Sequence, residues 1–421
     1  MDIARTTAAL RGAPRVRAAA VLHAGGELVA YVVPGHNTAA VSAWRDAFRE
    51  IYKEPAAPDG FDARGWVSSI DGKPLAEQDM RAWRDTTVAR LLAAPPGRVL
   101  EVGCGNGLLA TELIGPCAAY TGTDIVAEGL PSLRTRLQPL GPGKATLVRA
   151  EATDLHTLPG EYDLIVLNSV IQYFPDARYL LDVLDQAVAK LSPGGRLFVG
   201  DVRHSGLAER LYVERAYARL AEPTPEKVAR LVRVSSTAEG ELLADPRFFV
   251  AYAHRLGPDW YADVEPKRGR YDNELSRYRF DATLGRTPVP GAAPVVRSFG
   301  DLPRLLAGHV SPIVLRDLPN ARLGSGGVHP EDVYELGAAH GYTVRLDWTG
   351  GGPEFDAYLS RDGRVAPLRL PPDGTPASHV SAPRLGGANE RHAAEVLAHL
   401  GEVLPADLMP ARIEIVDTLP T

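Results

Sequence analysis

The stretch RVLEVGCGNG, at residues 98–107, joins an apolar strand pattern to a glycine-rich turn. Glycine is needed where the main chain takes a positive φ, or where it must approach a ligand without a Cβ in between. In doubly wound α/β folds, ligands bind in the crevice at the carboxyl ends of the strands, which is where this turn would lie. The stretch therefore predicts a Rossmann-like, doubly wound α/β fold with a ligand at the end of one strand.

The spacing of the glycines narrows the choice of ligand. A dinucleotide-binding turn would need Gly or Ala at position 108, where this chain has Leu108. Glycine instead occupies positions 103, 105 and 107, and Glu101 stands two residues before the first of them. This pattern favours a ligand without a pyrophosphate. We expect S-adenosyl-L-methionine, with S-adenosyl-L-homocysteine as its product, and no metal.

Residues at the ends of successive strands are candidates for holding this ligand. Glu101 is placed to orient the ligand's ammonium group through a water molecule. Asp124 follows the turn by about 20 residues, the usual place for an acidic residue that binds ribose hydroxyls. Glu151 is placed on the adenine side. The full set of predicted cofactor-binding residues is Trp66, Glu101, Gly103, Gly105, Gly107, Asp124, Ile125, Glu151, Ala152 and Asn168.

Short apolar runs alternate with amphipathic stretches around the glycine turn. The clearest helix pattern runs from Leu180 to Leu191, with Asp176 as its expected N-cap and Pro193-Gly194-Gly195 as its stop. Alternation of strands and helices predicts a mostly parallel sheet with helices on both faces. The predicted strands are Arg98–Val102, Tyr120–Asp124, Ala145–Arg149, Leu164–Asn168 and Arg196–Asp201.

Breaks in these patterns divide the chain into parts. Two apolar runs at 16–22 and 27–33 predict a hairpin, and the spacing at 41–54 predicts a helix. Pro- and Gly-rich stretches at 287–291 and 371–374 predict linkers. We expect an N-terminal piece at 1–36, a helical lead-in covering the cofactor site at 37–97, the cofactor-binding core at 98–286, an accessory α/β region at 287–375 and a C-terminal piece at 376–421.

Composition excludes several other classes of protein. The chain has 421 residues and a net charge of −6, which argues against a nucleic-acid partner. Its two cysteines, Cys104 and Cys117, fit no metal or redox motif, so we expect a reduced, cytoplasmic protein. No apolar run reaches the roughly 18 to 20 residues of a membrane span, and no signal peptide is expected.

Several motifs resemble the methyltransferase domains embedded in the adenylation domains of nonribosomal peptide synthetases, which are class I S-adenosylmethionine-dependent N-methyltransferases. The most discriminating are Asn-Ser-Val-x-Gln-Tyr-Phe-Pro at 168–175 and Asn-Glu-Leu-Ser-x-Tyr at 273–278. Together the motifs span about Ala43 to Leu284, with a looser likeness in Leu-Pro-Asn-Ala-Arg at 318–322. The other segments that carry the resemblance are 65–69, 99–107, 200–203, 245–249 and the whole of 267–279, which contains the second of these motifs.

The two ends of the chain, 1–35 and about 385–421, resemble parts of the small C-terminal subdomain of an adenylation domain. The stretch Leu-Pro-Ala-Asp-Leu-Met-Pro at 404–410 carries this likeness. The resemblance implies N-methylation of the α-amine of an aminoacyl thioester on a peptidyl carrier protein, with other synthetase subunits as further possible partners. Because no large adenylation subdomain is found and the chain ends before the usual catalytic lysine, we expect that it does not activate an amino acid itself.

The candidate catalytic residues are Asn168, Gln172, Tyr173, Tyr271 and Glu274. Asn168, Gln172 and Tyr173 follow the fourth predicted strand and should line the methyl-transfer end of the cleft. A neutral amine needs no strong base, so a carboxylate such as Glu274, or a Tyr, could orient it and relay a proton.

For most of these residues a structural role is the alternative. Glu274 could pair with Arg270 or Arg277, and Tyr173 could be packing. Trp66 could belong to the core, His204 to a loop, and Cys104 could simply fill space. For the whole chain, two alternatives stay open: O-, S- or C-methylation of a small metabolite or side chain, and a non-catalytic scaffold.

Overall fold

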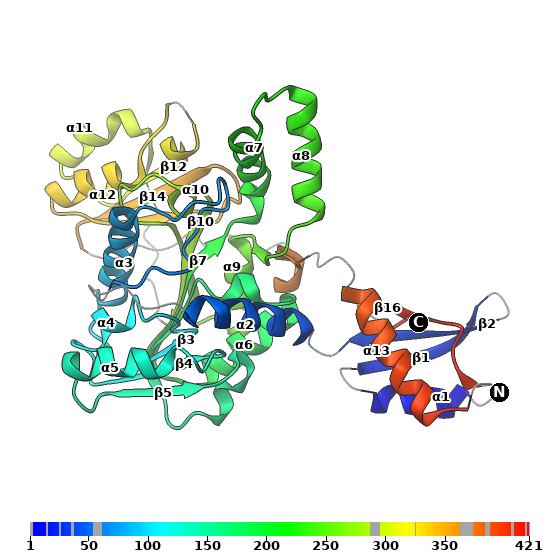
Figure 1. Cartoon of the computed structure of the whole chain (residues 1–421). Coiled ribbons are helices and arrows are strands. Elements are labelled where there is room, and N and C mark those ends of the chain that lie inside the picture. The colour runs from blue at the N-terminus through cyan, green and yellow to red at the C-terminus, as the bar shows by residue number, and fades with distance from the viewer. Residues whose placement is uncertain are drawn as a thin grey trace.

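The computed structural model describes residues 3–13, 16–24, 27–34, 38–53, 61–286, 295–324, 326–362, 374–383, 388–405, 408–416 and 419–420. At its centre is a seven-stranded sheet (Figure 1). The first five strands are parallel, and β10 is antiparallel to both of its neighbours. All five predicted strands are present, and the Rossmann-like fold is confirmed. The order is β5 (Ala145–Arg149), β4 (Ala119–Asp124), β3 (Arg98–Val102), β6 (Tyr162–Asn168), β7 (Leu191–Arg203), β10 (Arg279–Arg286) and β9 (Trp260–Pro266).

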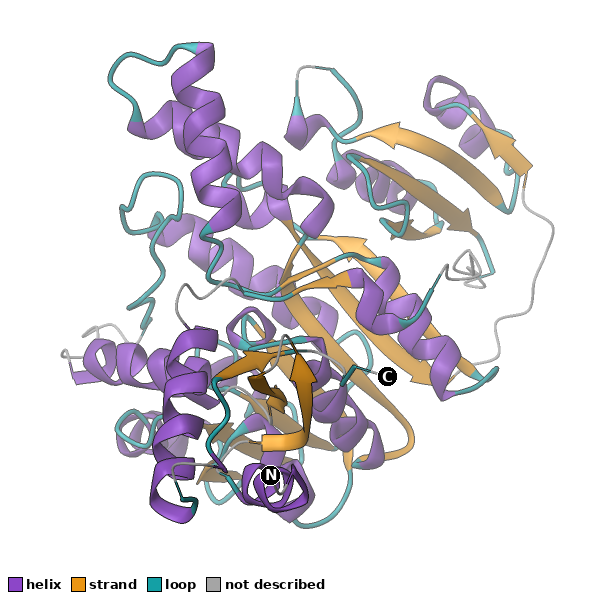
Figure 2. Cartoon of the chain, turned by 90° about the vertical axis from the view of Figure 1, so that its right-hand side faces the viewer, coloured by secondary structure: helices purple, strands orange, loops and turns teal. Residues whose placement is uncertain are grey.

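Both faces of this sheet are covered (Figure 2). Alternate residues of a strand point to opposite faces, so each central strand contributes to two apolar clusters. In β6, Leu164 and Val166 belong to one buried cluster, whereas Ile165 and Leu167 belong to another. The first cluster includes residues of α3 (Glu77–Leu91), α4 (Ala110–Leu113) and α5 (Leu130–Leu140). The second includes residues of α6 (Ala177–Ala189) and α9 (Arg247–Leu256).

Helix α6 begins as the sequence predicts, since the Asp176 side chain accepts a hydrogen bond from Tyr179 N at 2.7 Å. The predicted stop differs. The helix ends at Ala189, and Pro193-Gly194-Gly195 lies inside β7, where the register against β6 shifts. The helix that follows the glycine turn, α4, is only four residues long.

Two further sets of elements attach to the core. The helix predicted at 41–54 is present as α2 (Thr38–Lys53), which crosses the core beside α6 (Figure 1). Helices α7 (Ala208–Arg219) and α8 (Pro225–Thr237) project together from the top of the core in the same view. The short α10 (Glu274–Tyr278) leads directly into β10.

The accessory region has its own four-stranded sheet, β11 (Val295–Arg297), β12 (Ile313–Pro319), β14 (Glu354–Ser360) and β13 (Thr343–Asp347) in that order. Helices α11 (Leu302–Ala307) and α12 (Pro330–Ala339) accompany it (Figure 1). The linkers predicted at 287–291 and 371–374 lie outside the described residues, apart from Gly374. Beyond them, β15 (Val380–Ser381) pairs with β8 (Leu243–Ala244), so the start of the predicted C-terminal piece lies with the core.

The two ends of the chain share one sheet. The predicted hairpin is present as β1 (Val16–Ala24) and β2 (Glu27–Pro34), and β16 (Arg412–Ile415) pairs with β2 in parallel. Helices α1 (Ile3–Gly12) and α13 (Ala388–Val403) pack on this sheet around a small apolar cluster that includes Leu10 and Leu400. Figure 1 shows this unit to one side of the core, and Figure 2 shows it in front. The methyltransferase-like segment is thus inserted between two halves of the terminal unit.

None of the helices described here is long and apolar enough to cross a bilayer.

Candidate active site

The glycine turn follows β3 with the backbone that the sequence predicts. Gly103, Gly105 and Gly107 all have positive φ, at 75°, 49° and 79°. A Cβ on Gly107 would lie 2.2 Å from Cδ1 of Leu133, and a Cβ on Gly105 would lie 3.0 Å from the Tyr52 hydroxyl. A side chain at either position would therefore strain the turn or enter the space in front of it.

That space is a cavity of about 380 Å³ at the carboxyl ends of β3, β4 and β6, a size suited to a small-molecule ligand. Most of the predicted site residues line it. They are Trp66, Glu101, Gly103, Gly105, Gly107, Asp124, Ile125, Ala152, Asn168, Gln172, Tyr173 and Glu274. The tertiary structure thus gathers both the cofactor-binding and the catalytic candidates around one cavity.

Asp124 ends β4 beside the turn and is nearly buried, at 7% exposure. Its Oδ2 accepts a hydrogen bond from Gly105 N at 2.9 Å, and its Oδ1 accepts one from Val126 N at 2.8 Å. Burial raises the pKa of Asp124, although these N–H donors oppose the rise. Each carboxylate oxygen retains further acceptor capacity, so the same group can hold the turn and accept from ribose hydroxyls.

Glu101 lies beneath the turn at 4% exposure, with its Oε2 2.7 Å from the Tyr120 hydroxyl. Burial raises the pKa of Glu101 to about 8, and the neighbouring charge of Asp124 adds to the rise, while the hydrogen bond from Tyr120 opposes it. A cation beside this carboxyl would favour its ionised form. The ammonium group that the sequence predicts here would be such a cation.

Helix α2 closes the cavity from the opposite side. Trp44, Phe48 and Tyr52 lie on its cavity face, as their helical spacing requires. The ring of Tyr173 packs against Trp44 at 4.6 Å and against Phe48 at 5.1 Å between centroids. Tyr173 thus forms part of the cavity wall, and burial raises the pKa of its phenol.

Asn168 and Gln172 also line this cavity. Asn168 Oδ1 and Gln172 Oε1 have no hydrogen-bond partner among the residues that the structure describes, but both oxygens are buried within the protein and do not open onto the cavity. A Cβ on Gly200 would lie 2.3 Å from Asn168 Oδ1, so this oxygen faces the neighbouring strand β7. The features that fit S-adenosylmethionine are the glycine cradle, Asp124 and Glu101.

Glu274 is the first residue of α10 and is 4% exposed. Its Oε2 accepts hydrogen bonds from Ser68 Oγ and from Ser69 N, both at 2.9 Å. The predicted alternative, a salt bridge to Arg270 or Arg277, is wrong. Those two arginines instead pair with acidic residues outside the cavity: Arg270 with Asp332 and Glu335, and Arg277 with Asp272 and Glu214.

Sequence reasoning missed several cavity residues. Ser69 lines the cavity beside Glu274; its segment, 65–69, carries the family resemblance, but only Trp66 was predicted to lie in the site. Trp66 lies in the cavity wall and also packs on the core Trp83, with ring centroids 4.6 Å apart. Arg203 and Arg279 line the cavity too, and both are neutralised, Arg279 by Asp201 and Arg203 by Glu239 and Glu241. Both arginines belong to segments that carry the family resemblance, which is the signal that could have marked them as site residues.

Two of the predicted site residues do not reach the cavity. Tyr271 is not among its lining residues; it is buried in the core cluster, against the face of Gly269. Burial raises the pKa of Tyr271 well above its ordinary value, which argues against proton transfer by this group. Glu151 also stays outside the lining, as the N-cap of the 3-10 turn η1 (Ala152–Thr157), with its N–H donating to Asp154 Oδ2 at 3.3 Å.

The remaining two candidates have structural roles. The Nδ1 of His204 accepts from Gly206 N at 3.1 Å, its ring packs on Trp348 and Phe280, and burial lowers its pKa to about 4. Cys104 is a buried free thiol within the glycine turn, and it belongs to the lining of the cavity. Among the described residues, no group of three or more His, Cys, Asp or Glu side chains could hold a metal ion.

Comparisons with known proteins agree with this geometry. A family model described as a methyltransferase domain matches residues 100–197. A probable non-canonical nonribosomal peptide synthetase, CymA of Salinispora arenicola, is 34% identical over 93% of this chain and 5% of its own length. Chondramide synthase of Chondromyces crocatus is 31% identical over 94% of this chain and 12% of its own length. The chain thus spans only a small part of these curated relatives.

A solved structure of the N-methyltransferase NodS from Bradyrhizobium japonicum, in complex with S-adenosyl-L-homocysteine, is 15% identical and covers 58% of this chain and 98% of its own, with a TM-score of 0.36. The family of the chain follows from the family-model match, from the alignment of almost the whole chain to part of each synthetase, and from the glycine cradle and the cavity. The chain belongs to the S-adenosylmethionine-dependent methyltransferases, as a domain of the kind embedded in nonribosomal peptide synthetases.

Proposed function

We propose that the chain N-methylates the α-amine of an aminoacyl thioester held by a peptidyl carrier protein. The observation that carries this proposal is Glu274, a buried carboxylate that lines the same cavity as the glycine turn. Both of its hydrogen bonds end on Oε2, so Oε1 makes no hydrogen bond among the described residues. An acceptor of this kind suits the N–H group of an amine.

The cofactor would lie in the half of the cavity formed by β3 and β4. We propose that Gly103 and Gly105 let the main chain approach it, that Asp124 accepts from its ribose hydroxyls, and that Glu101 faces its ammonium group. Ile125 and Ala152 would border the adenine. When bound, S-adenosylmethionine supplies an electrophilic methyl group on a sulfonium.

The chain's own task is then to align a neutral amine with that methyl group, and alignment alone can supply several kcal/mol. A free α-amine has a pKa of about 7.7 to 8.0, and an adjacent thioester lowers it, so little basicity is required. We propose that Glu274 orients the amine and takes its proton, while Asn168 and Gln172 form part of the wall beside the substrate. Tyr173 and Trp66 would exclude water from the reacting groups.

The partner of the chain, the role of its terminal unit and its cellular location are further parts of this proposal. The curated relatives named above are peptide synthetases, which suggests a carrier protein as the partner. The terminal unit of β1, β2 and β16 would correspond to the small adenylation subdomain into which the methyltransferase is inserted. Both cysteines are free and buried, which suits the reducing cytoplasm, where we place the protein.

The test is methyl transfer to carriers that differ only in the acceptor atom. Wild-type chain and labelled S-adenosylmethionine are incubated with a carrier loaded with an amino acid, and in parallel with the same carrier loaded with the corresponding α-hydroxy acid. We expect the aminoacyl arm alone to gain one methyl group, recovered as N-methyl amino acid after hydrolysis. Methylation of the hydroxy acid, or of free small molecules only, would refute the proposal in favour of the alternative acceptors.

A further inference from the structure

The main chain from Lys267 to Ser276 connects β9 to α10 and carries Glu274 to the cavity. Two buried side chains of the accessory region contact this segment. We propose that Arg322 and Glu331 form a clamp on the main chain of residues 267–276, and that this clamp positions Glu274 for catalysis. The inference rests on the proposed function in giving Glu274 its role, and it assigns a function to the accessory region.

Arg322 forms one side of the clamp. It lies in the 3-10 turn η5 (Ala321–Leu323) and is 7% exposed. Its Nη1 donates to Lys267 O at 2.6 Å and makes a longer contact with Ser276 O at 3.5 Å, while Nη2 donates to Gly269 O at 2.5 Å. One guanidinium thus joins the beginning and the end of the segment, a task suited to its planar fork of donors.

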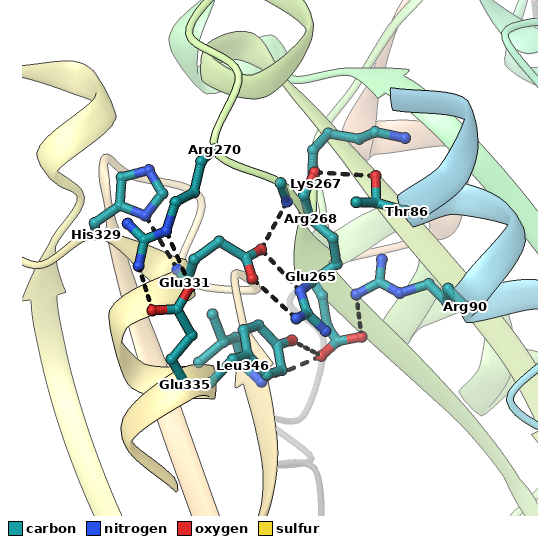
Figure 3. A network of polar contacts seen from close by, with 12 residues as sticks. Thr86, Arg90, Glu265, Lys267, Arg268, Arg270, His329, Glu331, Glu335 and Leu346 are labelled. Atoms are coloured by element: carbon teal, nitrogen blue, oxygen red, sulfur yellow. Dashed lines mark hydrogen bonds and ion pairs between the residues drawn. The ribbon is translucent and has the colours of Figure 1, made fainter. Parts of the chain in front are cut away.

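Glu331 forms the other side. It lies at the start of α12 and is 6% exposed. Its Oε1 accepts from Gly269 N at 2.7 Å and from Arg268 Nε at 2.8 Å, and its Oε2 accepts from Arg268 Nη2 at 2.9 Å (Figure 3). Glu331 therefore binds the N–H of Gly269, whereas Arg322 binds its C=O.

Gly269 is the point where the two sides meet, and its own geometry fixes the path of the chain. Its φ is 109°, and a Cβ on it would lie 2.6 Å from Cε1 of Tyr271. Tyr271, the Tyr that failed to reach the cavity, thus packs on the clamped residue. The segment then enters α10 through Asn273, whose Oδ1 accepts from Leu275 N at 2.9 Å, and Glu274 follows in a fixed position.

The clamp also explains the looser motif at 318–322. Asn320 holds Arg322 in place, because its Oδ1 accepts from Arg322 N at 3.1 Å. Ala321 N donates to Val328 O at 3.1 Å and ties the turn to the next segment. Burying a guanidinium costs free energy, and apolar residues of similar volume often stabilise a fold at least as much as a buried charged group does. A buried arginine bound to main-chain carbonyls therefore points to a positioning role.

Arg270 provides a matched control, because it belongs to the same segment and contacts the same helix. It pairs with Asp332 and Glu335, but its side chain is 51% exposed, and exposed ion pairs contribute little. In Figure 3 it points away from Arg268 toward Glu335.

The experiment compares Arg322→Gln, Arg322→Lys, Glu331→Gln and Arg270→Gln in the full chain. Methyl transfer to the aminoacyl carrier is measured together with S-adenosylhomocysteine affinity and amide hydrogen exchange of residues 267–276. We expect Arg322→Gln and Glu331→Gln to lower kcat by about 10- to 100-fold, to speed exchange in the segment, and to leave cofactor affinity within about twofold. Arg322→Lys should restore part of the loss, and Arg270→Gln should resemble wild type.

A double variant asks whether Arg322 acts through Glu274. We expect Glu274→Gln combined with Arg322→Gln to be no slower than Glu274→Gln alone, because the clamp has nothing left to position. Additive losses, or unchanged exchange at 267–276 in both clamp variants, would overturn the inference. If Arg322→Gln does not fold, the inference is tested with Arg322→Lys and Glu331→Gln, using the same measurements of kcat, cofactor affinity and amide exchange. If wild type transfers no methyl group to the carrier, the proposed function fails, and the exchange readings still judge the clamp.

Discussion

The proposed cofactor half and the proposed acceptor half of this cavity are built in different ways. The cofactor half comes from one strand, one turn and the next strand, so Glu101, Gly105 and Asp124 lie within a short stretch of chain. The acceptor half joins distant segments, since Ser68 and Glu274 are 206 residues apart and still share a hydrogen bond. Glu274 also depends on the accessory region, through the clamp proposed above.

Because of this difference, we expect substitutions in the two halves to affect different properties of the protein. The cofactor half is fixed by local backbone geometry within a parallel sheet, so changes there should act on cofactor binding. The acceptor half is fixed by long-range contacts, so changes there should slow transfer while the cofactor still binds. Three substitutions test this contrast, from the largest expected effect to the smallest.

Asp124→Ala should have the largest effect. It removes the acceptor that holds Gly105 N and Val126 N, together with the expected contacts to ribose, and hydrogen bonds to a charged group contribute about 1.5 to 3 kcal/mol each. We expect S-adenosylhomocysteine affinity to fall by about a thousandfold, measured by calorimetry. Glu112→Ala, which removes an exposed carboxylate on α4 just beyond the turn, should bind as wild type does. Unchanged affinity in Asp124→Ala would show that Asp124 serves only the fold.

Glu274→Gln should have the next largest effect, and on a different quantity. The amide keeps the shape of the side chain and an acceptor for Ser68 and Ser69, but loses the negative charge. We expect kcat for the aminoacyl carrier to fall by about 100-fold, with cofactor affinity unchanged. Asp272→Asn, two residues away and exposed, is the control. Full activity in Glu274→Gln would mean that the substrate amine loses its proton without help from this carboxylate.

Glu101→Gln should have the smallest effect, seen as a change in pH dependence. Below about pH 8 the raised pKa keeps Glu101 protonated in the free protein, and a bound ammonium group should favour the ionised form. Binding should therefore release a proton, and affinity for S-adenosylhomocysteine should rise by about tenfold between about pH 6 and pH 8. The Gln variant should show a flatter profile. A wild-type profile that is already flat would place the ammonium away from Glu101.

The successes and failures of the sequence predictions follow the same division. The five strands, the Asp176 cap and the glycine turn depend on neighbours in the chain, and the structure confirms them. The adenine-side prediction for Glu151 and the catalytic prediction for Tyr271 depended on side-chain direction. In the structure, Glu151 is the N-cap of η1, and Tyr271 lies in the core.

The sequence by itself determined the sheet, the glycine cradle and the identity of the cofactor, because strand periodicity and backbone freedom are local properties. Only the tertiary structure decided that α2 covers the cavity, that Glu274 bonds to Ser68 and Ser69 rather than to an arginine, and that Arg322 holds the segment beside it. Those contacts join residues far apart in the chain, and their pairing is set by how the helices and the accessory sheet pack.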